Sequence, residues 1–314
     1  MLRFVLGRIL SAIPTLLIVS VTVFFLIRLV PGDPAALLLG DHGDAAALAE
    51  LRAQLGLDQS VLTQFRIWFF KVLSGDFGTS IWVGEPVLPL IIQKFLVSVQ
   101  VVIPAVILAT LIAVPAGILA AARQNSVVDV GLISVATLLL SIPTFWLGLL
   151  FLLVFGLHLG WLPVVGYVSV RTDFVGGLLY LILPILTLLL HEIGTIIRMS
   201  RASTLEVLRL DYITHARAKG LSEGAILWRH TFKNAFGPTL TLLGLILGNL
   251  LSGIAVIETV FTIPGLGRLM VDAIYARDYP VIQGCMLFIA FIYILVNLCI
   301  DLLYSFFDPK VMTQ

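Results

Sequence analysis

The sequence is poor in charge. Only 12% of its 314 residues are Asp, Glu, Lys or Arg, about half of the roughly 25% that soluble domains carry. Apolar residues make up 60% of the chain, which leaves too little polar surface for a fold in water. These figures exclude a soluble domain and a disordered chain, and they favour an all-α polytopic membrane protein. The net charge of +1 gives no reason to expect nucleic acid as a partner.

Cysteine is scarce as well. Cys285 and Cys299 are the only two in the chain, so a disulfide-stabilised scaffold is excluded. If they share a helix, fourteen positions separate them by about 21 Å, too far for a disulfide between them. We interpret both as apolar packing residues.

Long charge-free runs predict where the chain crosses the membrane. A spanning helix needs about 20 apolar residues, and we expect six such helices. The fourth is the shortest and is expected to continue past His191 and Glu192 toward Ile197. Glu192 should lie near a membrane boundary or face a protein interior, because a lipid-facing charge is costly. The six runs are 9–27, 95–122, 130–157, 174–190, 235–257 and 279–300.

The first run could be confused with a signal peptide. It is longer than the usual apolar core of such a peptide, and no small-residue cleavage site follows it. We therefore interpret it as a retained transmembrane helix.

Lysine and arginine predict the orientation in the membrane. With the N-terminus inside, eleven of the nineteen basic residues fall in four cytoplasmic segments. Seven of the eleven lie in the single loop 191–234. Both termini are therefore expected in the cytoplasm, in agreement with six spans. The four segments are 1–8, 123–129, 191–234 and 301–314.

The predicted spans divide the chain into three parts. Residues 1–94 should hold the first span and an extracytoplasmic helical loop, with amphipathic helices over 44–55, ending at Gly56, and over 61–73. Residues 95–305 should form the transmembrane core, which includes the loop 191–234. Residues 306–314 should form a cytoplasmic tail.

The loop 191–234 has the pattern of two short helices separated by a glycine. The first helix should break at Gly220, and Ser222 is placed to cap the second. An exposed helix–glycine–helix unit with aromatic and basic residues suits docking to another protein. The alternative interpretation is a basic loop that binds lipid headgroups, and it stays open. The candidate docking residues are Asp211, Tyr212, Thr214, His215, Ala216, Arg217, Ala218, Lys219, Gly220 and Ser222.

Several different short motifs follow one another along the chain in a characteristic order. In the cytoplasmic loop they are 216–220 (Ala-Arg-Ala-Lys-Gly), Arg229-His230, Asn234-Ala235 and Pro238. Elsewhere they are 31–34, 55–59, 75–78, 160–163, 264–268 (Pro-Gly-Leu-Gly-Arg), 277–283 and 308–309. Together they resemble the permease subunits of binding-protein-dependent ABC importers, in the branch for dipeptides, oligopeptides and nickel complexes. The family's general Glu-Ala-Ala signature is matched only at Ala216 and Gly220.

The resemblance implies a type I importer permease in the bacterial inner membrane that works by alternating access. Its implied partners are a second homologous permease, two cytosolic ABC ATPases, an extracytoplasmic solute-binding protein and membrane lipid. The resemblance favours a heterodimer of the two permeases. ATP and Mg²⁺ would bind the ATPases, so no catalytic residue, cofactor site or metal site is expected on this chain. The lysines support this expectation. A phosphate-binding P-loop needs a lysine directly after a glycine, and none of the five lysines follows a glycine.

The loop around Ala216 and Gly220 would then couple the permease to an ATPase. A second candidate contact is the outer loop 258–278, with a rigid turn at Thr262, Pro264, Gly265 and Gly267. This turn is either a connector packed against its own helices or a finger that enters the binding protein's cleft. Likewise, Gly244 and Gly248 allow close helix approach, within the chain or at a subunit seam.

The sequence also bears on two other classes of protein. His191-Glu192 begins the zinc-protease pattern His-Glu-x-x-His, but Thr195 stands where the second histidine is needed. A membrane-embedded enzyme is therefore disfavoured. A secondary transporter or channel without ATPase partners stays the alternative, because charge-poor helices occur in those proteins too.

Overall fold

The computed structural model describes residues 2–29, 46, 48, 49, 52 and 58–307. Over these residues the chain is helical, apart from turns and one isolated β-bridge between Thr79 and Pro86. Most of the predicted helix 44–55, together with Gly56, lies outside the described residues, as do 308–314.

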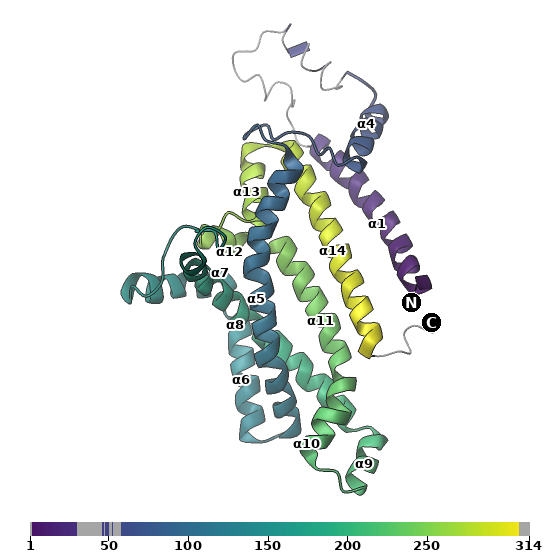
Figure 1. Ribbon diagram of the computed structural model, residues 1–314, viewed down its shortest axis with the longest axis vertical. Helices are drawn as coiled ribbons and strands as arrows, with labels where there is room; N and C mark the ends of the chain where they lie inside the picture. The colour runs from purple at the N-terminus through teal and green to yellow at the C-terminus, as the bar shows by residue number, and fades with distance from the viewer. Residues whose placement is uncertain (1, 30–45, 47, 50–51, 53–57, 308–314) are drawn as a thin grey trace.

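Among the described residues, five long apolar helices have the length of membrane spans, and each overlaps one of the predicted runs. In Figure 1, α5, α11 and α14 run side by side and α1 flanks α14. Cys285 and Cys299 both lie on α14 and are free thiols. The five helices are α1 (Leu2–Leu29), α5 (Val87–Ala122), α8 (Phe174–Leu208), α11 (Phe232–Gly253) and α14 (Tyr279–Phe307).

The third apolar run, 130–157, is bent and does not form one continuous helix. After α6 (Val127–Ser141) the chain turns by 92° into α7 (Thr144–Phe151) and the π-helix η2 (Leu152–His158). The reason is local: the residue before a proline is driven out of the helical region. Ile142, before Pro143, is extended with φ −89° and ψ 123°.

The helix α8 packs against α5, α6 and α11 and is approached closely on two sides. A Cβ on Gly117 of α5 would lie 2.7 Å from the Ile197 carbonyl oxygen. On the other side, a Cβ on Gly194 of α8 would lie 2.5 Å from the Ala136 carbonyl oxygen of α6. Glu192 is 8% exposed, so this carboxyl faces the protein interior rather than lipid.

Gly244 and Gly248 pack within the chain. Cβ atoms at these two positions of α11 would each lie 2.6 Å from a side-chain atom of α14, on Ile300 and Tyr293 respectively. Small residues allow such helices to approach closely in a membrane. Of the two interpretations of this glycine pair, the intrachain seam is the one observed.

The helix α1 contacts α14 near its start and α4 (Val61–Leu73) near its other end. Near its start, the Arg8 guanidinium lies 3.0 Å from the Asp301 carboxylate of α14. Near its other end, the Phe24 ring packs 5.1 Å from Phe65 and 5.4 Å from Trp68 of α4. The predicted amphipathic helix over 61–73 is confirmed with these bounds.

Candidate functional sites: the α9–α10 hairpin and the Trp82 cleft

The predicted helix–glycine–helix unit is present as α9 (Asp211–Ala218) and α10 (Glu223–Ala225), here called the α9–α10 hairpin. Gly220 joins them with φ +78°, a left-handed conformation that favours glycine. The Ser222 hydroxyl accepts a hydrogen bond from the Ala225 backbone N–H at 3.4 Å, as a helix cap does. The second helix is not separate, because α10 continues through the π-helix η3 (Ile226–Thr231) into α11.

The inner side of the α9–α10 hairpin holds the two short helices together. Ile213 and Ile226 are fully buried against each other and against Ala216. Across the turn, the Arg217 guanidinium donates to both Glu223 carboxylate oxygens, at 2.8 and 3.2 Å. This contact raises the pKa of Arg217 above its usual value. The hairpin is therefore closed on itself and can move as one unit.

The outer side of the α9–α10 hairpin is open to solvent. The remaining candidate docking residues on it are exposed, including Asp211, Thr214, His215, Ala218 and Lys219. Large apolar side chains lie beside them, with exposed fractions of 39% for Tyr212 and 58% for Trp228. Exposed aromatic side chains of this kind are enriched in protein interfaces.

The α9–α10 hairpin is connected to the bundle by short, stiff links. Arg209 and Leu210 alone separate α8 from α9, while the other end runs unbroken into α11. The Asn234 side chain of α11 donates to the Tyr212 hydroxyl at 2.8 Å. Figure 1 places the hairpin at the opposite end of the molecule from α13. A displacement of the hairpin would therefore be passed to α8 and α11.

The opposite end is built around a buried carboxylate between α12 (Ala255–Val260) and α13 (Leu266–Ala276). Glu258 is fully buried and accepts from the Ser98 hydroxyl at 2.5 Å and the Arg268 backbone N–H at 2.8 Å. It caps the start of α13, where Gly265 has no side chain to do so. Burial raises the pKa of Glu258, and hydrogen bonds from Ser98 and the backbone oppose that shift.

The four residues predicted to contact a binding protein lie in this region, and three of them are packed against other parts of the chain. A Cβ on Gly265 would overlap the Glu258 carboxylate, and one on Gly267 would lie 2.7 Å from the Ala255 backbone. The Thr262 hydroxyl accepts from the Gly166 backbone N–H at 2.8 Å. These contacts suit a packed connector, and the contact with a binding protein stays a prediction.

Asp278 forms a second buried polar link that the sequence analysis missed. It is 2% exposed and accepts from the Ser80 hydroxyl at 2.5 Å and the Trp82 backbone N–H at 3.2 Å. It also accepts from the Val281 backbone N–H, at the start of α14, at 3.4 Å. The segment before α5 is thereby fastened to the α13–α14 junction. One sequence feature could have pointed to Asp278: it stands directly before the start of a helix, where an aspartate can act as a cap.

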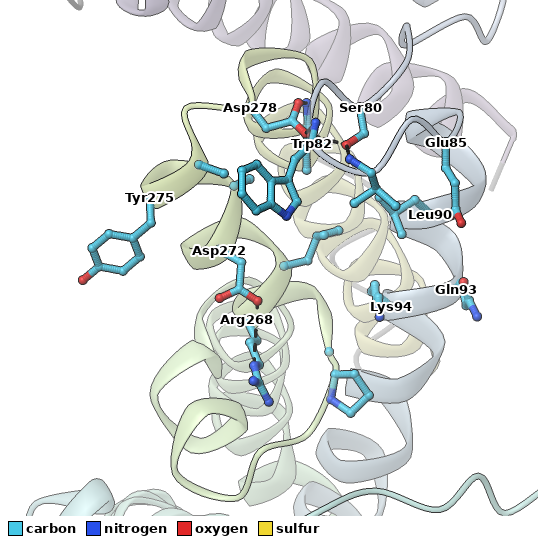
Figure 2. A pocket seen from close by; sticks show the side chains of 17 residues that line it. Ser80, Trp82, Glu85, Leu90, Gln93, Lys94, Arg268, Asp272, Tyr275 and Asp278 are labelled. Carbon is cyan, nitrogen blue, oxygen red and sulfur yellow. Dashed lines mark hydrogen bonds and ion pairs between the residues drawn. The ribbon is translucent and has the colours of Figure 1, made fainter. Parts of the chain in front are cut away.

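A cleft of about 890 Å³ lies beside Asp278, here called the Trp82 cleft. Figure 2 shows Lys94 on its α5 side, Arg268 and Asp272 on its α13 side, the Trp82 indole over it, and Tyr275 pointing outward. Trp82 is 77% exposed and Tyr275 85%. Sequence reasoning did not identify this cleft, because its walls are 170 or more positions apart along the chain. Further lining residues are Ser80, Val83, Glu85, Leu90, Gln93, Pro264, Gly265, Leu269, Ala273, Ala276, Asp278 and Val281.

The fold is that of a type I ABC importer permease. An inward-facing structure of the MetNI methionine ABC transporter superposes with a TM-score of 0.57 and 16% sequence identity. The match covers 70% of this chain and 96% of that one. At this identity the likeness concerns the fold alone.

The chain belongs to the binding-protein-dependent transport system inner membrane components. The model of that family matches residues 113–313, and the model of its N-terminal part matches residues 1–103. The protein is thus a multi-pass inner-membrane permease subunit of an ABC importer. In the orientation predicted from lysine and arginine, the α9–α10 hairpin lies at the cytoplasmic end and the Trp82 cleft at the extracytoplasmic end.

Relatives match along nearly the whole chain. A putative peptide transport system permease protein of Brucella suis biovar 1 (strain 1330) is 40% identical over 311 residues, covering 99% of both chains. The glutathione transport system permease protein GsiC of Salmonella choleraesuis (strain SC-B67) is 43% identical over 311 residues, with the same coverage. A probable peptide ABC transporter permease protein of Sinorhizobium fredii is 40% identical over 308 residues, covering 98% of both.

Proposed function

We propose that this permease forms the transmembrane pathway for short peptides and is coupled to cytosolic ATPases through the α9–α10 hairpin. The observation that carries the proposal is a rigid hairpin with an exposed aromatic and charged face, joined directly to α8 and α11. The relatives named for peptide and glutathione transport support peptides as the solute class. Nickel complexes, expected from the sequence resemblance, stay a second solute class to be tested.

The proposed mechanism is alternating access. ATP and Mg²⁺ bind two partner ATPases, and their closure pushes on the outer face of the hairpin. Because Ile213, Ala216 and Ile226 hold the hairpin together, the push reorients α8 and α11 and opens the pathway outward. ATP hydrolysis resets it. A second homologous permease completes the pathway, as a heterodimer, and a solute-binding protein delivers peptide at the extracytoplasmic end. Thr262 and Pro264 are candidate contacts for that delivery.

Gly220 provides a direct test of coupling. Its φ of +78° is a backbone conformation that β-branched residues adopt at a cost of about 1–3 kcal/mol. Gly220→Val should therefore distort the outer face of the hairpin and abolish ATP-driven peptide uptake, while the chain still inserts in the membrane. Asparagine tolerates this conformation, so Gly220→Asn is the matched control and should retain uptake.

Two results would overturn the proposal. One is normal uptake and normal solute-stimulated ATP hydrolysis by the assembled Gly220→Val complex. The other is flux of solute through the purified chain in liposomes without ATPases, which would indicate the alternative of a secondary transporter or channel.

A further inference from the structure

Two cations reach the Trp82 cleft from two different helices. Lys94 of α5 and Arg268 of α13 both line it, on facing walls. Among the described residues, the Lys94 ammonium makes no ion pair. Arg268 lies 3.8 Å from Asp272 on its own helix, which is longer than a hydrogen bond, and the buried Glu258 is a second acidic neighbour. The guanidinium thus keeps donors available for a ligand.

This arrangement is suited to an organic carboxylate. Arginine offers a planar pair of N–H donors that fits the two oxygens of a carboxylate, and lysine adds a point charge. The cleft also has apolar walls, formed by Leu90, Leu269 and the Pro264 ring. An inorganic anion would leave these walls uncovered, whereas a carboxylate attached to a short carbon skeleton would cover them.

Trp82 is held in a position to cover such a ligand. Its backbone N–H is bonded to the buried Asp278 carboxylate at 3.2 Å, and Asp278 is also bonded to Ser80. The backbone is therefore fixed, while the indole, 77% exposed, lies over the cleft in Figure 2. Aromatic rings placed in this way supply large contact area with little loss of conformational entropy.

The cleft carries acidic groups as well. Asp272 lines the same wall as Arg268, and Glu85 lies at the rim. A ligand with an ammonium group near its carboxylate would therefore find both signs of charge within one cleft of about 890 Å³, a size typical of small-molecule sites.

We propose that the Trp82 cleft binds the terminal carboxylate of a short peptide, between Lys94 and Arg268 and beneath Trp82. The permease thus has a solute site of its own at the extracytoplasmic end. The inference rests on the proposed function as a peptide importer and adds a recognition site to it. An acidic side chain of the binding protein has the same chemistry, and the experiment separates the two sources.

The test uses the assembled importer complex in lipid nanodiscs without the binding protein. Binding of trialanine, trialanine amide and N-acetyl-trialanine is measured by calorimetry or by saturation-transfer NMR. Replacing the carboxylate by an amide removes charge-assisted hydrogen bonds and should weaken binding about tenfold or more. Acetylating the amino end should have the smaller effect.

The variants link this preference to the two cations. Lys94→Met and Arg268→Gln should each bind trialanine about tenfold more weakly and should no longer distinguish it from its amide. Arg277→Gln is the matched control, because Arg277 is an exposed cation nearby that does not line the cleft, and its binding should equal that of the unchanged complex. Unchanged melting temperatures show that the variants are folded.

Three results would overturn the inference. The first is equal binding of the acid and the amide by the unchanged complex. The second is an equal weakening of trialanine and trialanine amide binding in the Lys94 and Arg268 variants, which would indicate a general distortion of the cleft. The third is unchanged peptide binding with weakened docking of the empty binding protein, which would assign the cations to that protein.

Failure of the proposed function would be visible separately. If the complete importer, with its binding protein, takes up no peptide on ATP addition, the proposed function fails whatever the cleft binds. If uptake is normal and the cleft shows no preference for carboxylate, the inference alone fails.

Discussion

The two ends of this permease are held together by different interactions. At the extracytoplasmic end, two buried carboxylates, Glu258 and Asp278, bind groups from distant parts of the chain. At the cytoplasmic end, the α9–α10 hairpin is held by three buried side chains and an exposed ion pair between Arg217 and Glu223. The outer end is thus fixed from within, whereas the hairpin presents a surface that a partner can cover.

This contrast predicts that equally small changes will have unequal effects at the two ends. Removing a buried partner leaves unsatisfied groups in the protein and costs the full desolvation of each. Removing an exposed partner leaves its counterpart in water, where the cost is small.

The largest effect is expected for Gly265→Ala. The added Cβ would overlap the Glu258 carboxylate and displace the cap of α13, at a cost of about 3 kcal/mol in the free energy of unfolding. Thermal melting of the purified chain in detergent measures it. Gly253→Ala is the control, since no atom lies within 4 Å of its new Cβ. Equal melting temperatures for the two variants would contradict the description of a fixed outer end.

Asp278→Ala should have the next largest effect. It leaves the Ser80 hydroxyl and the Trp82 backbone N–H without their acceptor, which costs about 2 kcal/mol. Asp278→Asn keeps the shape and one acceptor oxygen, so it should lose less than half of that. The same melting assay applies, together with tryptophan fluorescence, which should shift if the Trp82 segment is released. Identical losses for the two variants would count against these hydrogen bonds.

The pH dependence of stability should show the burial of Glu258. Its pKa in the folded chain is raised, so its contribution to stability is complete below the unfolded pKa and is lost as pH rises through the folded pKa. Glu258→Gln removes the titration while keeping the size of the side chain. The melting temperature of the unchanged protein minus that of Glu258→Gln should therefore fall as pH rises above about 4.5, the ordinary value. A constant difference across that range would contradict the assignment.

The smallest effect is expected at the hairpin ion pair. The side chains of Arg217 and Glu223 are 43% and 63% exposed, so a double-mutant cycle with alanine should give a coupling energy below about 1 kcal/mol. The coupling energy should shrink further at 1 M salt, where the Debye length falls to about 3 Å. A coupling of about 2 kcal/mol, unchanged by salt, would show that the hairpin is as tightly fixed as the outer end.

Sequence patterns predicted the local features well. The 61–73 helix, the break at Gly220 and the Ser222 cap follow from residue spacing and from glycine and serine chemistry over a few positions. The bend after α6 also follows from a local rule, because Pro143 acts on its direct neighbour Ile142.

The polar contacts at the outer end could not be predicted in the same way. Ser98 and Glu258 are 160 positions apart, and Ser80 and Asp278 are 198 apart. No local rule pairs such residues. The glycine pattern of 264–268 was recognised, but its reason, the space taken by the Glu258 carboxylate, depends on packing.

The sequence by itself determined that this protein lies in a membrane and how many apolar segments it has, and it predicts which loop faces the cytoplasm. Those properties depend on the cost of placing charge in lipid, which each segment bears on its own. The tertiary structure alone decided which glycines separate helices, which carboxylates are buried and that Lys94 and Arg268 face one cleft. Those properties depend on the distance between groups that the chain brings together only when it packs.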